Sequence, residues 1–201
     1  MAMAFVEPVV LTGNHVSLEP LTVEHSAALK AAAADGELWN LWFTSVPRPE
    51  DAEANTAYRL GLREQGSMMP FVVRRLSDAV IVGATTYMNI VAEHRRLEIG
   101  STWYAQSVQR TAVNTEAKLL LLTHAFETLN CIAVEFRTHW MNRPSRAAIE
   151  RLGAKLDGVL RAHMIGRNGE LRDTCVYSIT APEWPTVKAG LVHRRLPPAG
   201  A

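Results

Sequence analysis

Strand-like and helical segments follow one another along this chain in an order that mixes tight hairpins with longer crossovers. The apolar runs at residues 70–76 and 80–90 are separated only by a short polar break, which predicts a hairpin. The next strand-like run, 97–104, reaches the one at 133–139 only through a strongly helical stretch at 114–129. Hairpins and strand–helix–strand crossovers in one chain predict a mixed sheet with helices on its faces.

The remaining segments extend this pattern without internal repeats or a Gly/Ser/Pro-rich linker. Residues 16–21 alternate between apolar and polar side chains, as a strand does. Further helices are predicted at 23–34, 49–66, 145–152 and 182–195, and two more strands at 155–165 and 171–179. We therefore expect one mixed α/β domain over residues 1–201, with its core at about 16–184 and a C-terminal helix at 182–195.

The composition narrows the class of protein. Hydrophobic residues make up 48% of the 201 residues and charged residues 20%, so a core can form without metals or disulfides. The net charge is +1 and no segment concentrates Lys and Arg, which argues against a nucleic-acid partner. No apolar run approaches the roughly 20 residues that cross a bilayer. Cys131 and Cys175 lack metal-ligand spacing, so we expect two buried thiols, no metal, no membrane partner and a cytoplasmic location.

The most informative block runs from Leu97 to Gly153. Its first strand ends in a polar turn, residues 105–111, that leads into a helix. Such a junction presents unpaired backbone N–H groups and the positive end of a helix dipole, so it suits an anion such as a pyrophosphate. The chain contains neither G-K-[ST] nor G-x-G-x-x-G, which excludes the phosphate-binding P-loop and the dinucleotide fingerprint.

Two stretches in this block carry a family resemblance. Residues 109–114, Q-R-T-A-V-N, resemble the Q/R-x-x-G-x-G/A loop by which GNAT N-acetyltransferases hold the CoA pyrophosphate, and residues 115–122 resemble the helix that follows it. Residues 142–154, N-R-P-S-R-A-A-I-E-R-L-G-A, are similar to the N-x-x-S-x-x-x-I-x-x-x-G-[AF] stretch of RimJ/RimL-like members and are the more specific match. The resemblance covers about residues 16–184.

This resemblance implies a GNAT fold whose mixed sheet splays open near Trp103, with acetyl-CoA in the splay. It also implies acetyl transfer to a primary amine, either a protein N-terminus or a small amine. At Thr102 and Trp103 we expect the main chain, rather than the side chains, to face the thioester oxygen. The positions that match the cofactor site are Thr102, Trp103, Gln109, Arg110, Thr111, Ala112, Val113, Asn114, Thr115, Asn142 and Arg146.

Ala112 departs from the family loop, where Gly is usual. A methyl group limits both a positive φ and the close approach of the backbone to phosphate. We expect the loop to accept Ala112 in a right-handed conformation. Glu116, in the first turn of the following helix, would repel a pyrophosphate unless it points outward.

Glu98 is the candidate general base. By alternation along its strand it projects to the face opposite Leu97 and Ile99. A carboxylate there could take the proton of an amine, directly or through water, before the amine attacks a thioester. The alternative role is a solvated carboxylate paired with Arg95 or Arg96. Two further candidate bases lie on strand positions near the presumed cleft, His139 and His163.

Ser145 is the candidate acid. It matches a family position close to the sulfur, where a hydroxyl can donate a proton to the departing thiolate. The resemblance places Asn142 at the pantetheine arm. Either residue could instead only cap the helix that begins nearby, because both side chains accept hydrogen bonds from a helix start.

Two other interpretations stay open beside the enzyme. A GNAT-fold module that binds acyl-CoA without turnover would share the same loop, and Ala112 in place of Gly favours it. A structural domain without a cofactor would require the match over residues 109–153 to be accidental. The aromatic cluster of Trp39, Trp42 and Phe43 predicts a substrate cleft or an interface, and we expect a homodimer.

Overall fold

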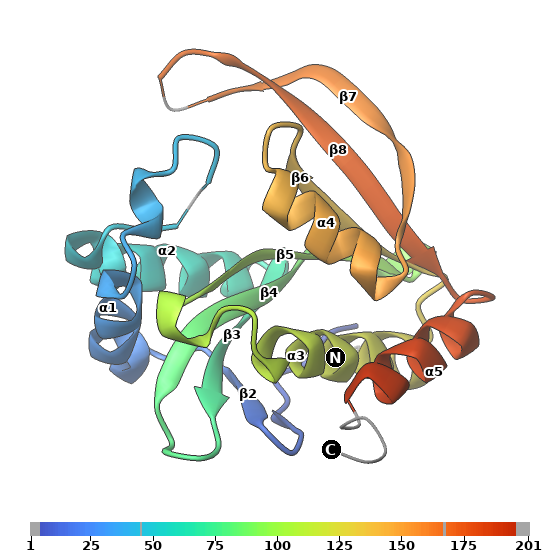
Figure 1. Cartoon of the computed structure of the whole chain (residues 1–201), viewed down its shortest axis with the longest axis horizontal. Helices are drawn as coiled ribbons and strands as arrows, with labels where there is room; N and C mark the ends of the chain where they lie inside the picture. The colour runs from blue at the N-terminus through green and yellow to red at the C-terminus, as the bar shows by residue number, and fades with distance from the viewer. Residues whose placement is uncertain (1–4, 45, 167, 196–201) are drawn as a thin grey trace.

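The computed structural model of the protein describes residues 5–44, 46–166 and 168–195. It contains one eight-stranded mixed sheet flanked by helices (Figure 1). The strand order is β1-β2-β3-β4-β5-β6-β8-β7. Neighbouring strands are antiparallel except β5 and β6, which are parallel. The mixed sheet predicted from the sequence is therefore confirmed.

The strands lie close to the predicted runs. Their bounds are β1 Leu11–Thr12, β2 Val16–Pro20, β3 Met68–Arg75, β4 Ile81–Val91, β5 Arg96–Tyr104, β6 Ala133–His139, β7 Lys155–Ile165 and β8 Leu171–Thr180. The strand β1 was not predicted, because two residues are too few to show an alternating pattern. The hairpin β7–β8 forms a long arm, and β8 rather than β7 lies beside β6 (Figure 1).

The helices are α1 Ser26–Ala34, α2 Ala52–Glu64, α3 Ala112–Thr123, α4 Arg143–Leu152 and α5 Trp184–Arg195. Helix α3 begins two residues before its predicted start, because Thr111 caps it and accepts the N–H of Val113 at 3.4 Å. Its predicted end at Leu129 is also different. The chain passes from α3 into a π-helical turn, His124–Thr128.

Helices α2 and α3 cover opposite faces of the sheet. Arg59 of α2 donates to the hydroxyl of Thr86 on β4 at 2.7 Å. The next residue on β4, Tyr87, donates to the carbonyl of Leu121 on α3 at 2.6 Å. Successive side chains of a strand point to opposite faces, so these two contacts place α2 and α3 on either side of β4.

Glu116 of α3 is fully buried and ties the helix to the N-terminal hairpin. Its carboxylate accepts the backbone N–H groups of Asn14, His15 and Val16 at 2.9, 2.5 and 2.9 Å. Gly13 permits this approach, since a Cβ there would lie 2.5 Å from the carboxyl carbon. Glu116 thus points neither toward an anion site nor outward, and both sequence-based expectations for it are wrong.

The sheet splits between β5 and β6. Their parallel pairing joins only Arg96–Glu98 to Ala133–Glu135. Beyond that point Ser101 has a φ of 48°, and the pairing of β5 with β4 shifts register between Ala84 and Thr86. Within the described sheet, the gap-facing backbone of residues 99–104 has no strand partner. The predicted splay is present, and it opens at Ile99, before Trp103.

Cys131 and Cys175 are buried free thiols, as expected from the sequence. In the described ranges, no helix combines the length and the apolar composition that a membrane span requires. The same ranges contain no group of three or more His, Cys, Asp or Glu residues arranged to hold a metal ion.

Candidate active site

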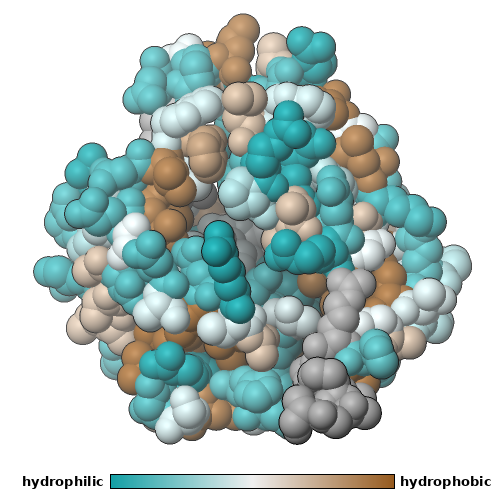
Figure 2. Space-filling view, in the orientation of Figure 1, coloured by the Kyte–Doolittle hydropathy of each residue, from teal (hydrophilic) through white to brown (hydrophobic). Residues whose placement is uncertain are grey.

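A cavity of about 670 Å³ opens where β5 and β6 separate. Its wall combines side chains of β5, β6, α3 and α4 with Arg172 of β8 and with residues that precede α2. This volume is typical of small-molecule sites, which span about 300–1,000 Å³. Figure 2 shows a hollow near the middle of the corresponding face, bordered by hydrophobic residues on its left and by hydrophilic residues on its right and below.

The start of α3 forms one end of this cavity. Gln109, Arg110 and Asn114 line it. Gln109 donates to the carbonyl of Tyr104 at 3.2 Å, which holds the loop against the end of β5. The first N–H groups of a helix have no intrahelical acceptor, so this end of the cavity offers backbone donors, the helix dipole and the Arg110 cation to an anion.

Other residues of the predicted loop turn their side chains elsewhere. Thr111, Ala112 and Val113 line a smaller neighbouring cavity, and Thr115 lines neither of the two. None of these four residues lines the main cavity. Ala112 is the first residue of α3 and has a right-handed backbone, as expected. The left-handed residue of the loop is Arg110, with a φ of 62°.

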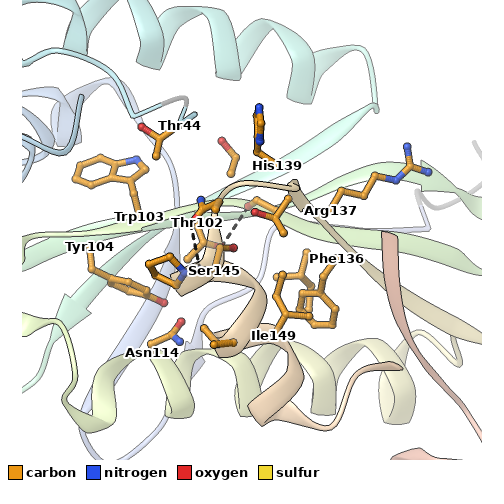
Figure 3. Close-up of a pocket in the computed structure, with 18 of the residues that line it drawn as sticks. Thr44, Thr102, Trp103, Tyr104, Asn114, Phe136, Arg137, His139, Ser145 and Ile149 are labelled. Atoms are coloured by element: carbon orange, nitrogen blue, oxygen red, sulfur yellow. Dashed lines mark hydrogen bonds between the residues drawn. The ribbon is translucent and has the colours of Figure 1, made fainter. Parts of the chain in front are cut away.

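Asn142 and Ser145 lie at the start of α4 and both line the cavity. The side-chain oxygen of Asn142 accepts the N–H of Ser145 at 3.1 Å, so Asn142 is the cap of α4 and Ser145 is not. The amide N–H groups of Asn142 remain available to a ligand. Figure 3 shows Ser145 near the middle of the cleft, between β5 and α4.

Arg146, one of the predicted cofactor contacts, does not line the cavity. Its guanidinium lies 4.2 Å from the ring centroid of Trp140 and donates to the hydroxyl of Tyr177 at 3.1 Å. These contacts hold the Arg146 side chain against Trp140 and Tyr177. Arg151, which the sequence patterns did not identify, lines the wall.

Lys118 is a further cavity residue that the sequence patterns did not identify. It lies one turn along α3 from Asn114 and is buried. Its ammonium group donates to the hydroxyls of Thr102 and Thr85 at 2.6 and 3.2 Å. These partners are neutral, and burial lowers the pKa of Lys118 from 10.5 to about 7. The cavity thus contains an amine that titrates near neutral pH.

This lowered pKa predicts a specific pH dependence of stability. Between pH 7 and 10.5 the unfolded chain keeps the Lys118 proton while the folded protein has lost it, so the Lys118 contribution to stability rises with pH. We expect the stability of Lys118→Met relative to wild type to fall by about 1.4 kcal/mol per pH unit from pH 7 to 9. Urea unfolding at several pH values measures this difference.

Lys30 provides the matched control for that experiment, because it is exposed on α1. Lys30→Met makes the same change at an exposed position, so it reports the effect of removing a lysine apart from burial. If the difference for Lys118→Met changes with pH no more than that for Lys30→Met, the folded protein holds Lys118 with an ordinary pKa.

Glu98 is buried, with 5% of its surface exposed. Asn89 donates to its carboxylate at 2.7 Å, and the Nε of Arg137 lies 3.6 Å from the same oxygen. Burial raises the pKa of Glu98, against the smaller lowering effects of Asn89 and Arg137. A raised pKa brings a carboxylate closer to the range in which a general base is effective.

Glu98 lies directly behind the cavity wall. Gly100 lines the cavity, and a Cβ at Gly100 would lie 2.7 Å from the Glu98 Oε1. Glu98 does not itself line the cavity, so a proton would reach it through water or after a small side-chain movement. The alternative of a solvated carboxylate paired with Arg95 or Arg96 is wrong, because Glu98 is buried and Arg96 pairs with Glu135 at 2.5 Å.

Neither histidine suits the role of base. His139 lines the cavity, but its Nδ1 accepts the N–H of Met141 at 3.0 Å. In the neutral ring the proton therefore sits on Nε2, which makes His139 a donor toward the cavity. His163 is exposed, hydrogen-bonds to Thr174 at 3.2 Å and does not line the cavity.

The aromatic cluster contributes to the cleft. Phe43 lines the cavity, and the ring of Trp42 packs edge-on to His139 with centroids 4.9 Å apart. In Figure 3, Thr44 and His139 lie on one side of the β5 and β6 ribbons, and Asn114 and Ile149 lie on the other. The cavity therefore opens to both faces of the sheet. Homodimerisation stays a prediction.

Comparisons with known proteins agree with this geometry. Residues 15–155 match the family described as acetyltransferase (GNAT) domain. The Bacillus subtilis protein named "Putative ribosomal N-acetyltransferase YdaF" is 28% identical over 144 residues, covering 72% of this chain and 78% of that one. A GCN5-related N-acetyltransferase structure from Brucella melitensis has a TM-score of 0.85 at 28% identity, covering 96% of this chain and 87% of its own.

A more distant structure shares the fold alone. The Mycobacterium smegmatis RimJ in complex with CoA-disulfide has a TM-score of 0.79 at 23% identity, covering 93% of this chain and 95% of its own. The split sheet, the helix start beside it and the match over most of the domain lead to one conclusion. This chain belongs to the GNAT acetyltransferase domain family and is similar to its ribosomal N-acetyltransferase branch.

Proposed function

We propose that this protein transfers the acetyl group of acetyl-CoA to a primary amine by direct attack, without a covalent enzyme intermediate. The observation that carries the proposal is a single cavity at the sheet split. An anion-binding helix start lies at one end of it, and a buried carboxylate and a serine hydroxyl lie beside its middle. Transfer from a thioester to an amine needs these groups in one place.

The donor would enter from the side of α3 and α4. Its pyrophosphate suits the positive end of the α3 dipole where Arg110 and Asn114 line the cavity. Its pantetheine arm carries amide groups, which suit the unpaired backbone of β5 beyond Ile99 and the free amide of Asn142. Lys118 would face the same arm, since it bonds to Thr102 on β5 and lines the cavity.

The chemistry needs one base and one acid. Glu98 would take the proton of the acceptor ammonium, because a protonated amine cannot attack. The amine nitrogen then bonds to the thioester carbon, and backbone N–H groups near Thr102 and Trp103 would stabilise the oxyanion. When the C–S bond breaks, Ser145 would protonate the thiolate and recover a proton from the acylated nitrogen through solvent.

Acetyl-CoA binding tests the donor site. The double change Arg110→Glu with Asn114→Asp puts negative charge at the start of α3, so we expect the affinity for acetyl-CoA to fall at least about tenfold, or 1.4 kcal/mol. Isothermal titration calorimetry measures the affinity. Arg143→Glu is the control for the charge reversal at Arg110, because Arg143 is exposed on α4 and does not line the cavity; the affinity of this variant should stay near that of wild type.

Two outcomes of this titration would count against the proposal. Absence of wild-type binding at millimolar acetyl-CoA would remove both the enzyme and the acyl-CoA-binding module as functions. Unchanged affinity in the double variant would place the donor in another loop. The alternative function, binding of acyl-CoA without catalysis, was favoured by Ala112 in place of Gly. That argument is weakened, because Ala112 has a helical backbone conformation that any residue can adopt. Release of CoA thiol in the presence of an amine then separates enzyme from module.

A further inference from the structure

The acceptor side of the cavity carries a row of polar residues on one sheet face. Glu98 of β5 lies opposite Glu135 of β6, and Arg137 and His139 follow Glu135 at two-residue steps. His139 lies opposite Thr174 of β8, so Arg172, two residues from Thr174, shares the same face. Arg137, His139 and Arg172 all line the cavity.

Two donors in this row are buried without an acceptor. The Nε of Arg172 and the Nε2 of His139 have no hydrogen-bond partner among the described residues. Leaving a buried donor unpaired destabilises a fold, so such groups point to a ligand that pairs with them. Because Nδ1 of His139 accepts the Met141 N–H, its Nε2 presents a proton, as Arg172 does. The missing partner is therefore an acceptor of hydrogen bonds.

The charges of the row leave one cation in excess. Glu135 pairs with Arg96 at 2.5 Å and with Arg137 at 3.0 Å, and Arg137 also lies 3.6 Å from Glu98. The neighbouring carboxylate of Asp173 is held by Arg161 at 2.7 Å on the adjacent strand.

Arg172 forms no ion pair within the described part of the chain. Together with Arg96, which lies beside the row, Arg137 and Arg172 bring three guanidinium groups to the two carboxylates Glu98 and Glu135, and the unpaired one, Arg172, lines the cavity. A negatively charged group on the ligand would balance this positive charge and accept the unpaired hydrogen bonds.

We infer that the acceptor is a primary amine that carries a carboxylate close to the amine, with the carboxylate bound by Arg172 and His139 and the amine directed to Glu98. The inference rests on the proposed acetyl transfer. An arginine suits a carboxylate because its planar guanidinium offers two parallel N–H donors. A free amino acid and a peptide that begins with Asp or Glu share this chemistry.

The closing experiment compares amines that differ only in the carboxylate. Amino acids are matched with their amides, and peptides beginning with Asp or Glu with those beginning with Asn or Gln; CoA thiol release reports the rate. We expect kcat/KM to favour the carboxylate about 10- to 100-fold, the range of a charge-assisted hydrogen bond. If the carboxylate raises kcat/KM only among the amino acids, the acceptor is a free amino acid. If it does so only among the peptides, the acceptor is a peptide that begins with Asp or Glu.

The variant Arg172→Gln should remove this preference by raising KM for the carboxylate-bearing amine, with KM for acetyl-CoA unchanged. Arg172→Lys should restore part of it, because lysine keeps the charge. Arg161→Gln is the control, since Arg161 is largely exposed on β7 and pairs with Asp173 rather than with the cavity.

Two failures are distinguishable. The inference is wrong if wild type acetylates the amino-acid amides and the Asn or Gln peptides as well as it acetylates the carboxylate-bearing substrates. It is also wrong if Arg172→Gln keeps the preference for the carboxylate. In both cases the proposed acetyltransferase activity stands. If no amine of either set is acetylated, the proposed function itself fails.

Discussion

Glu98→Gln should lower kcat about 100- to 10,000-fold, the usual cost of removing a general base, while KM for acetyl-CoA stays close to wild type. Glutamine fills the same volume behind Gly100 and can still accept the hydrogen bond of Asn89, so the fold and the donor site are kept. It cannot take a proton. Steady-state kinetics with a saturating amine measures the loss.

The pH profile adds a second readout. Since burial raises the pKa of Glu98 above 4.5, the wild-type rate should fall as the pH drops through that raised value. The variant should lose this acid limb and regain part of its rate at high pH, where more amine is already neutral. Glu93→Gln, an exposed change in the turn before β5, is the control. A loss of kcat below about tenfold in Glu98→Gln would mean that a chain of water molecules, rather than Glu98, takes the proton of the amine.

Ser145→Ala provides a contrast with Glu98→Gln. It removes the donor to the thiolate, so its defect should persist at high pH and shrink when the acyl donor has a better leaving group. Asn142 already caps α4, so a mere cap defect is not expected. Full turnover in Ser145→Ala would exclude the hydroxyl from the mechanism.

Glu116→Ala should lower the free energy of unfolding by about 3 to 6 kcal/mol, the cost of leaving several buried donors without their acceptor. The carboxylate accepts three backbone N–H groups of residues 14–16, and a methyl group accepts none. Glu116→Gln keeps one oxygen and should lie between the two. Urea unfolding at one pH measures all three proteins.

The control for this series is Glu53→Ala, an exposed change on α2, which should stay within about 0.5 kcal/mol of wild type. A cost below about 1 kcal/mol for Glu116→Ala would mean that water replaces the carboxylate and that the hairpin is not held by it.

Periodicity was sufficient for most of the fold. The strands β6 and β7 have the predicted bounds. In β6 the apolar side chains alternate with polar ones, and β7 lies between Gly153 and the turn that begins at Gly166, so its ends are marked by turn residues. The end of α3 was harder to predict. The apolar pattern continues through residues 124–128, but the backbone there widens into a π-helical turn, and side-chain spacing hardly distinguishes the two helix types.

The site was harder to predict from the sequence, because its contacts join segments that are distant along the chain. The partners of Glu116 lie about 100 residues away, and no local pattern reports them. Lys118 did leave a signal: a lysine within A-K-L-L-L-L, three and four residues before the fully buried Leu121 and Leu122, has to lie on the buried face. The motif gives spacing along the chain and not contacts in space, so it did not show that Arg146 packs against Trp140 and Tyr177.

The three-pair seam between β5 and β6 has a consequence for the catalytic cycle. A pantetheine arm laid along the open edge of β5 would act as a surrogate strand. Every contact of that kind, and every contact at the start of α3, would be made with parts of acetyl-CoA that are still present in CoA. The gap would therefore bind CoA almost as tightly as it binds acetyl-CoA. Release of CoA, rather than the acetyl transfer itself, would then limit the rate of turnover.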